Sequence, residues 1–296
     1  MKEKPFSKYQ ILANAVMIIW TLAIILPFIL LFMSSITDEN TLVANGYSFF
    51  PKKFSLASYS YIIKSGGQIL KAYGVSIGVT VVGTLLNVLL SALMAYPLSV
   101  KNLPGRNVMM FFVFFTMLFN GGIVPSYIMW TGTFHIKDTI FAQLLPNFLL
   151  SAWNVMMIRT YFTTSIPDGL YEAAEIDGAS QFTIFWKIVL PLGKPILVTM
   201  GTFAGLAYWN DWTNGLYYIV KNTGLYNVQN LLNQMVQNIH FLTQSSNSNV
   251  TAAASTIPAT GIQMAIAFVA ILPIMLIFPS FQKYYAKGIA LGAVKG

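Results

Sequence analysis

The stretch ANAVMIIWTLAIILPFILLFM, residues 13–33, holds 21 residues and no charged side chain. An α-helix needs about 20 mostly apolar residues to cross the hydrocarbon core of a bilayer, so this run is long enough to span one. Lys2, Lys4 and Lys8 precede it, as basic residues precede a secretory signal. The run is too long for the apolar region of such a signal, and no Ala-x-Ala cleavage site follows it. We therefore predict that it is retained as a transmembrane helix.

Further apolar runs repeat this pattern along the chain. Hydrophobic residues make up 56% of the 296 residues and charged residues 9%, whereas soluble domains carry about 25% charged residues. We predict an all-α membrane protein in which residues 1–296 form one transmembrane domain embedded in the lipid bilayer. Its six predicted spans are approximately 13–33, 73–98, 108–129, 139–157, 195–212 and 262–281.

The distribution of basic residues predicts the orientation of these spans. Eleven Lys and Arg flank the spans on the side of the amino terminus and six on the opposite side, which makes up the total of 17. Because basic residues favour the cytoplasmic side, we expect both termini and the loop 159–194 to be cytoplasmic. Loops 34–72 and 213–261 are then external, and helical spacing in 228–241 predicts an amphipathic helix in the second of them. The net charge of +8 lies in no basic run, so we expect no nucleic-acid partner.

Several catalytic signatures are absent from the sequence. It contains no phosphate-binding Gly-x-x-x-x-Gly-Lys-Ser/Thr loop, no Gly-x-Ser-x-Gly elbow and no His-Glu-x-x-His motif. With no Cys and two His, it offers little for a metal site. Asp211 is the only ionisable group near membrane depth, and we expect it at the membrane interface. We therefore expect a non-enzymatic chain that binds no cofactor or metal and obtains its energy from elsewhere.

The loop 159–194 contains the most informative local pattern. Its segment SIPDGLYEAAEIDG, residues 165–178, starts with Pro and acidic residues and ends with Gly178, as a short helix would. Ser180 is placed to cap a second helix, Gln181 to Val189, which we expect Pro191 and Pro195 to close. Two alanines give the first helix a small-residue surface for close approach by a partner, and the carboxylate before them suits a basic residue of that partner. From composition alone, a solvated connector remains the simpler interpretation.

The spacing of this loop resembles a known family signature. Glu172-Ala173-Ala174, three residues, Gly178, nine residues and then Ile188-Val189-Leu190-Pro191 is similar to the EAA loop of permease subunits of binding-protein-dependent ABC importers. Asp177-Gly178-Ala179-Ser180 and the tail 282–288 extend the resemblance to the maltose-type carbohydrate permeases. It implies a type I ABC importer permease fold in a bacterial cell membrane. It also implies that the loop couples to the ATPase subunit through Glu172, Ala173, Ala174, Asp177, Gly178, Leu190 and Pro191.

The resemblance further implies partners and a cargo. A second, homologous permease subunit would form a heterodimer with this chain, and two ATPase subunits would bind ATP and magnesium. An extracellular solute-binding protein would deliver an oligosaccharide or glycan, which alternating access would move inward. The same architecture importing a peptide or an amino-acid derivative is one alternative, and a membrane scaffold subunit without transport activity is another.

Polar and aromatic residues inside the spans are candidates for a substrate pathway. Indole rings beside amides and carboxylates suit a sugar, although Trp at a membrane boundary also forms the ordinary aromatic belt. Amides at membrane depth are equally expected to make interhelical hydrogen bonds. Gly-x-x-x-Gly patterns at Gly74/Gly78 and Gly201/Gly205 predict close helix packing, and residues 119–125 predict a kink in the third span or a gate of unwound backbone. The pathway candidates are Asn87, Trp153, Asn154, Trp209, Asn210 and Asp211.

Overall fold

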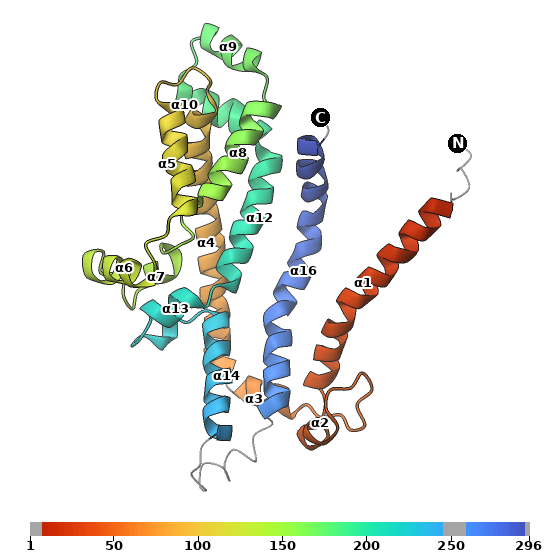
Figure 1. Cartoon of the computed structure of the whole chain (residues 1–296). Helices are drawn as coiled ribbons and strands as arrows, with labels where there is room; N and C mark the ends of the chain where they lie inside the picture. The colour runs from red at the N-terminus through yellow and green to blue at the C-terminus, as the bar shows by residue number, and fades with distance from the viewer. Residues whose placement is uncertain (1–7, 65, 245–258, 294–296) are drawn as a thin grey trace. The chain divides into compact units, whose positions relative to one another are not determined.

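The computed structural model describes residues 8–64, 66–244 and 259–293, and in these residues the chain is helical, with a single β-bridge between Thr37 and Phe54. The Ser/Asn tract 245–249 lies outside the described residues. The helices, including turns of π- and 3₁₀-helix (η), are α1 Lys8–Ser35, α2 Glu39–Asn45, α3 Ala57–Lys64, α4 Gly66–Ser99, α5 Arg106–Leu118, α6 Ile123–Ile128, η1 Met129–Thr133, α7 Phe141–Leu144, α8 Ala152–Ser165, α9 Asp168–Ile176, α10 Gln181–Ile184, η2 Phe185–Val189, α11 Leu190–Leu192, α12 Lys194–Asn210, α13 Thr213–Tyr218, η3 Thr223–Leu225, α14 Val228–Gln244 and α16 Ala259–Ala293 (Figure 1).

Three helices of the described chain are long and apolar enough to cross a bilayer by themselves, namely Tyr9–Ser35, Gly67–Ser99 and Ala259–Ile277. They correspond to the first, second and sixth predicted spans, which are confirmed as continuous helices. Two bent helix pairs raise the number of candidate spans to five if each pair counts as one. The amphipathic helix predicted at 228–241 is also confirmed, as α14.

The third predicted span, 108–129, is not one helix. α5 ends at Leu118 and α6 begins at Ile123, and the two halves of this segment are bent by 109°. Asn120 Oδ1 accepts the backbone N–H of Gly122 at 2.8 Å, and Gly122 has φ +86°. This local turn competes with the helical hydrogen bonds. Of the two alternatives for residues 119–125, the kink in a continuous helix is therefore wrong and the unwound backbone is present, while its role as a gate stays a prediction.

The fourth predicted span, 139–157, is not one continuous helix. Residues 139–151 contain only the four-residue α7, and α8 starts at Ala152 and continues to Ser165. Pro146 has no N–H to donate to a helix, and Asn147 has φ +67°. Ser151 then caps α8 by accepting the N–H of Asn154 at 3.5 Å. Apolar composition across the whole segment concealed this turn.

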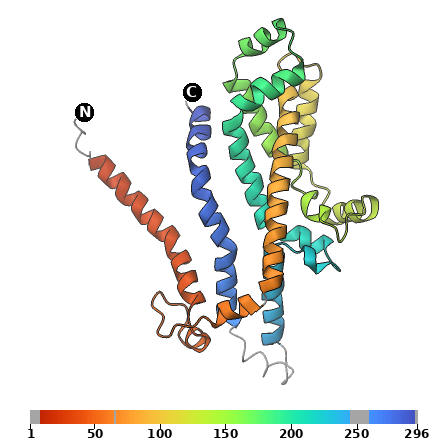
Figure 2. The same cartoon turned by 180° about the vertical axis from the view of Figure 1, so that it is seen from behind.

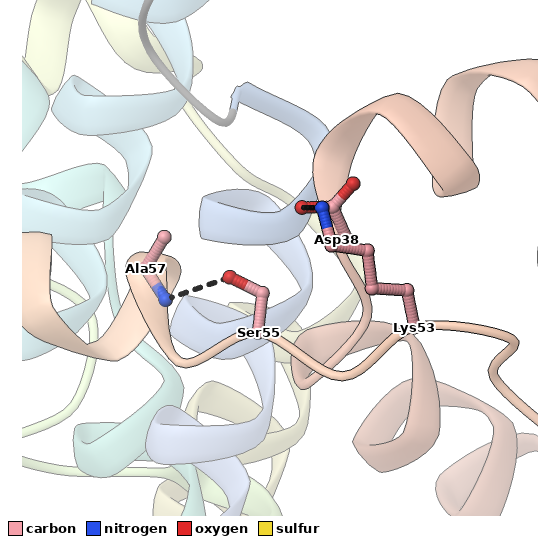
Figure 3. A network of polar contacts seen from close by, with 4 residues as sticks. All are labelled: Asp38, Lys53, Ser55 and Ala57. Atoms are coloured by element: carbon pink, nitrogen blue, oxygen red, sulfur yellow. Dashed lines mark hydrogen bonds and ion pairs between the residues drawn. The ribbon is translucent and has the colours of Figure 1, made fainter.

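Contacts within the chain define two units, the first of residues 1–69 and 232–274 and the second of residues 70–231 and 275–296. In the first unit, Asp38 N–H donates to Lys53 O at 3.0 Å, and the Lys53 ammonium lies 3.3 Å from the Asp38 carboxylate. Ser55 Oγ accepts the N–H of Ala57 at 3.2 Å at the start of α3 (Figure 3). The two contacts between Asp38 and Lys53 join the ends of the segment that carries α2.

A carboxylate of α2 also fixes the start of α16 within the first unit. The two oxygens of Glu39 accept the N–H groups of Thr260 and Gly261, each at 2.8 Å. Backbone N–H groups in the first turn of a helix have no intrahelical acceptor, so this carboxylate satisfies two of them. Phe32 of α1 packs on Phe268 of α16 with ring centroids 4.9 Å apart.

In the second unit, α4, α5, α8 and α12 lie side by side (Figures 1 and 2). The predicted close approach at Gly201 and Gly205 is confirmed, because a Cβ there would lie 3.3 Å from side-chain atoms of α4. Gly74 and Gly78 have open space around them in the described chain, so close packing at that pattern is wrong for this subunit by itself. A further approach that the sequence did not suggest occurs at Gly83, where a Cβ would lie less than 3 Å from the buried ring of Tyr208.

Candidate functional site

The predicted first helix of the loop 159–194 is present as α9, at one end of the second unit next to α10 (Figure 1). Pro167 is extended, with ψ 136°, and directly precedes the helix. Its fixed φ and missing N–H suit a helix start. Asp168 lies in the first turn, where a carboxylate interacts favourably with the positive end of the helix dipole.

Gly178 ends α9 through a Schellman motif. Its φ is +78°, a left-handed conformation that glycine adopts without steric cost. The N–H of Gly178 donates to Glu175 O at 3.0 Å, and the N–H of Ala179 donates to Ala174 O at 2.9 Å. These two hydrogen bonds, together with the left-handed residue, define the motif. The predicted role of Gly178 as the helix stop is confirmed.

The second helix of the loop starts as predicted but ends later. Ser180 Oγ accepts the N–H of Thr183 at 3.2 Å and so caps α10. The helix then passes through a π-turn, in which the N–H of Leu190 donates to Phe185 O. Pro191 lies within α11 and does not close the helix. The wider turn before Pro191 accommodates the residue that lacks an N–H, and the 78° bend comes between Leu192 and α12.

The residues assigned to ATPase coupling differ in exposure. Glu172, Ala173, Asp177, Gly178 and Pro191 are exposed, and Leu190 is partly buried. Ala174 is only 8% exposed and packs in the hydrophobic core of the second unit. The predicted surface formed by both alanines is therefore wrong, because Ala174 faces inward and only Ala173 faces outward.

Large apolar side chains that the sequence analysis did not single out extend this surface. Ile176 is 86% exposed and Phe182 is 65% exposed, and Leu170 and Trp186 are also exposed. Exposed apolar groups beside carboxylates are typical of a surface that another protein covers. Ile176 and Phe182 lie within about one helical turn of the predicted stop at Gly178 along the sequence, and this proximity was the available signal.

A hydrogen-bonded glutamine connects this surface to α4. Gln181 Nε2 donates to Glu175 Oε1 at 2.8 Å, and Gln181 Oε1 accepts the hydroxyl of Tyr96 at 2.6 Å. The ring of Tyr96 packs against Phe185 with centroids 5.4 Å apart. A displacement of α9 therefore reaches α4 through direct contacts.

Two of the pathway candidates meet inside the second unit. Asn154 Nδ2 donates to Asn87 Oδ1 at 2.7 Å, and Asn87 Nδ2 donates to Phe148 O at 2.6 Å. Both asparagines are buried, so the interhelical hydrogen bond that was the alternative interpretation is present between α4 and α8. Trp153, the neighbour of Asn154, is 52% exposed.

The remaining candidates lie at the end of α12. Asp211 is 5% exposed, and its Oδ1 accepts the N–H of Thr213 at 3.0 Å and that of Asn214 at 3.2 Å. This carboxylate therefore organises the turn into α13. Trp209 is buried and Asn210 is exposed, so the cluster does not present one common surface.

A buried amide network surrounds this turn, and the sequence analysis missed it. Asn227 Nδ2 donates to the backbone oxygen of Asp211 at 2.6 Å, and Gln143 Nε2 donates to Asn230 Oδ1 at 3.3 Å. All four residues are buried. The described residues contain no group of three or more His, Cys, Asp or Glu side chains able to hold a metal ion.

Comparison with known proteins adds four findings. The family model described as "Binding-protein-dependent transport system inner membrane component" matches residues 6–291. Protein LplC of Bacillus subtilis is 36% identical over 92% of this chain and 90% of its own length. The polygalacturonan/rhamnogalacturonan transport system permease protein YtcP of the same organism is also 36% identical, over 97% of this chain and 98% of its own length. A chain in the crystal structure of a bacterial ABC transporter involved in the import of the acidic polysaccharide alginate matches with a TM-score of 0.78 and 26% identity, over 95% of this chain and all of that chain.

Proposed function

Because the chain belongs to the family of binding-protein-dependent transport system inner membrane components, we propose that it is the permease subunit through which an ABC importer takes up an oligosaccharide or a polysaccharide fragment. The family resemblance drawn from the EAA loop is confirmed by this membership, as is a multi-pass location in the membrane. The permease fold itself is supported by the TM-score of 0.78. The carbohydrate is the proposed part.

The names of the relatives support a carbohydrate over a peptide. YtcP is named for polygalacturonan and rhamnogalacturonan, and AraQ of Bacillus subtilis, 26% identical over 98% of this chain, is named for arabinooligosaccharides. The alginate importer adds a third polymeric glycan. Peptide import and a scaffold role have no comparable support.

We also propose the arrangement of the membrane segments and partners. α9 faces the cytoplasm, and both termini lie on that side. The three long helices, the two bent helix pairs and α8 then make six membrane crossings. A second permease subunit, two ATPase subunits that bind ATP and magnesium, and an extracellular binding protein complete the importer. The polar termini of α9 and its charged surface suit an aqueous compartment and not the hydrocarbon core.

The geometry of α9 is the observation that carries the coupling mechanism. Its exposed surface offers Glu172 to a basic residue of the ATPase and Ile176 to an apolar pocket. The Schellman motif fixes the direction in which the chain leaves this surface, and Gln181 connects it to α4. ATP binding favours one conformation of the ATPase pair, and the contacts of α9 transmit that preference to the spans.

The pathway candidates differ in the exposure of their side chains. Asn87, Asn154 and Asp211 are buried and engaged in hydrogen bonds of the chain itself, so we assign them to shaping the helices. Trp153 and Asn210 keep exposed side chains and are available to contact a sugar.

The test uses the assembled importer in lipid nanodiscs with its cognate binding protein. We expect ATP hydrolysis to accelerate when the binding protein carries an oligosaccharide released from a plant or algal polysaccharide, and not when a peptide mixture replaces the sugar. Acceleration by peptides alone would refute the carbohydrate assignment. Purification of the chain without any ATPase subunit would instead favour the scaffold role.

A further inference from the structure

A basic hollow lies where the chain passes from α4 into α5. Its volume is about 320 Å³, and its lining residues are Lys101, Leu103, Gly105, Arg106, Asn107 and Val108. The hollow contains none of the pathway candidates, and it borders α9 through Lys101, whose ammonium pairs with Asp168. Two of its six lining residues are cationic and none is acidic, which favours an anionic ligand.

Arg106 contributes a guanidinium group to the lining of this hollow. Its Nε atom is buried and has no hydrogen-bond partner, although buried charged donors in proteins are normally paired. A second guanidinium, that of Arg159, lies at the end of α4, where its Nε donates to Leu98 O at 3.2 Å. Within the described part of the chain, neither arginine forms an ion pair with a carboxylate. Planar guanidinium groups bind phosphate with paired, directed hydrogen bonds.

The backbone at the hollow adds to the positive potential. Gly105 precedes the 13-residue α5 and provides no side-chain cap for its first turn. The first N–H groups of a helix lack intrahelical acceptors and carry the positive end of the dipole. An anion at this position therefore meets both the arginine and the helix start.

The position of the hollow indicates where the anion comes from. α5 exposes Val108, Phe111, Phe112 and Phe115, so its lipid-compatible surface begins immediately after Arg106. A helix of this kind enters the hydrocarbon at its first turn, and the residues just before that turn lie at the level of the lipid headgroups. Basic pockets at this level bind anionic headgroups.

We propose that Lys101 and Arg106 bind the phosphate group of an anionic phospholipid headgroup in this hollow. The site also touches the coupling surface, because Lys101 forms an ion pair with Asp168 in the first turn of α9. A headgroup phosphate beside Lys101 would act on the charge balance at that end of α9. The proposal does not depend on which solute is transported, and it holds on either face of the membrane because both faces carry headgroups.

The test measures lipid retained by the assembled importer. The complex is reconstituted with phosphatidylcholine and phosphatidylglycerol, extracted in mild detergent, and examined by native mass spectrometry. We expect Arg106→Gln to weaken phosphatidylglycerol binding about fivefold, the contribution of one basic residue near a charged lipid surface. Lys187→Gln is the matched control, since Lys187 is an exposed cation outside the hollow. We expect this control to retain the lipid like the unaltered complex.

Equal phosphatidylglycerol retention by the Arg106→Gln and Lys187→Gln complexes would overturn the proposal. If the Arg106→Gln complex fails to assemble, Arg106→Lys and Lys101→Gln replace it in the same comparison. Inorganic phosphate is added in a second arm, to complexes in phosphatidylcholine alone. This arm measures the thermal stability of the complex. The lipid assignment would be overturned in favour of a soluble phosphate compound if inorganic phosphate stabilised the complex as much as phosphatidylglycerol does and if this stabilisation required Arg106.

Discussion

The turn at Gly178 provides the sharpest test of coupling, because the cost of altering it follows from the structure. A Cβ at this position would meet nothing within 4 Å, so no steric clash with another residue contributes. The cost of Gly178→Val is therefore the cost of holding an L-residue at φ +78°, about 1–2 kcal/mol. A β-branched side chain places it at the upper end of that range. This energy lowers the ratio of correctly turned to misdirected loop by about 5- to 30-fold.

Gly178→Asn is the matched control, because asparagine tolerates the left-handed conformation far better than valine does. We expect the Gly178→Val complex to reach the membrane and to pair with its partner permease, since the change lies outside the spans. Its affinity for the ATPase subunits, or the acceleration of ATP hydrolysis by loaded binding protein, should fall by up to the same 5- to 30-fold factor. The asparagine variant should stay close to the unaltered complex. Wild-type assembly and stimulation in the valine variant would refute the coupling role of this turn.

Three further tests concern packing, polar contacts and topology. Gly83→Val should cost about 1–3 kcal/mol by overpacking against the buried tyrosine ring of α12, whereas Gly74→Val, in open space, should leave the thermal stability of the complex unchanged. Asn154→Ala removes the hydrogen bond between α4 and α8 and should cost about 0.6–2 kcal/mol, measured by denaturant unfolding of the complex; an unchanged midpoint would count against that contact. The chain has no native Cys, so single cysteines can report its orientation. A cysteine at position 246 should react with an impermeant thiol reagent on intact cells, and one at Ser180 should not. The opposite labelling would invert the proposed orientation.

The long spans could be predicted from the sequence because each one is specified by the summed apolar character of its own residues. Each residue of 13–33 adds to the same apolar total, and the resulting helix needs no particular neighbour. The breaks in the third and fourth runs could not be predicted in this way. A single asparagine turn at Asn120 or Asn147 changes the chain direction while leaving the mean hydropathy of the run almost unchanged.

The helix ends in the coupling loop could be predicted from the sequence, but the side chains that face inward could not. The Schellman motif at Gly178 and the cap at Ser180 depend on residues only a few positions away, so the residue types suffice to place them. The inward direction of Ala174 depends on the core that it meets, including Phe185 and the spans behind it. The pairing of Asn87 with Asn154 likewise joins residues 67 positions apart. Residue type alone does not specify such tertiary partners.

The two kinds of exposed apolar surface in this chain require different partners. The run 13–33 of α1 carries no charge, so lipid can cover its exposed side chains. Ile176 is equally exposed, but α9 also exposes Glu172 and Asp177, and burying such carboxylates in hydrocarbon is costly. Lipid therefore cannot cover Ile176, and water is a poor solvent for it. Another protein can satisfy both the apolar and the charged groups of this helix, as the proposed ATPase subunit would.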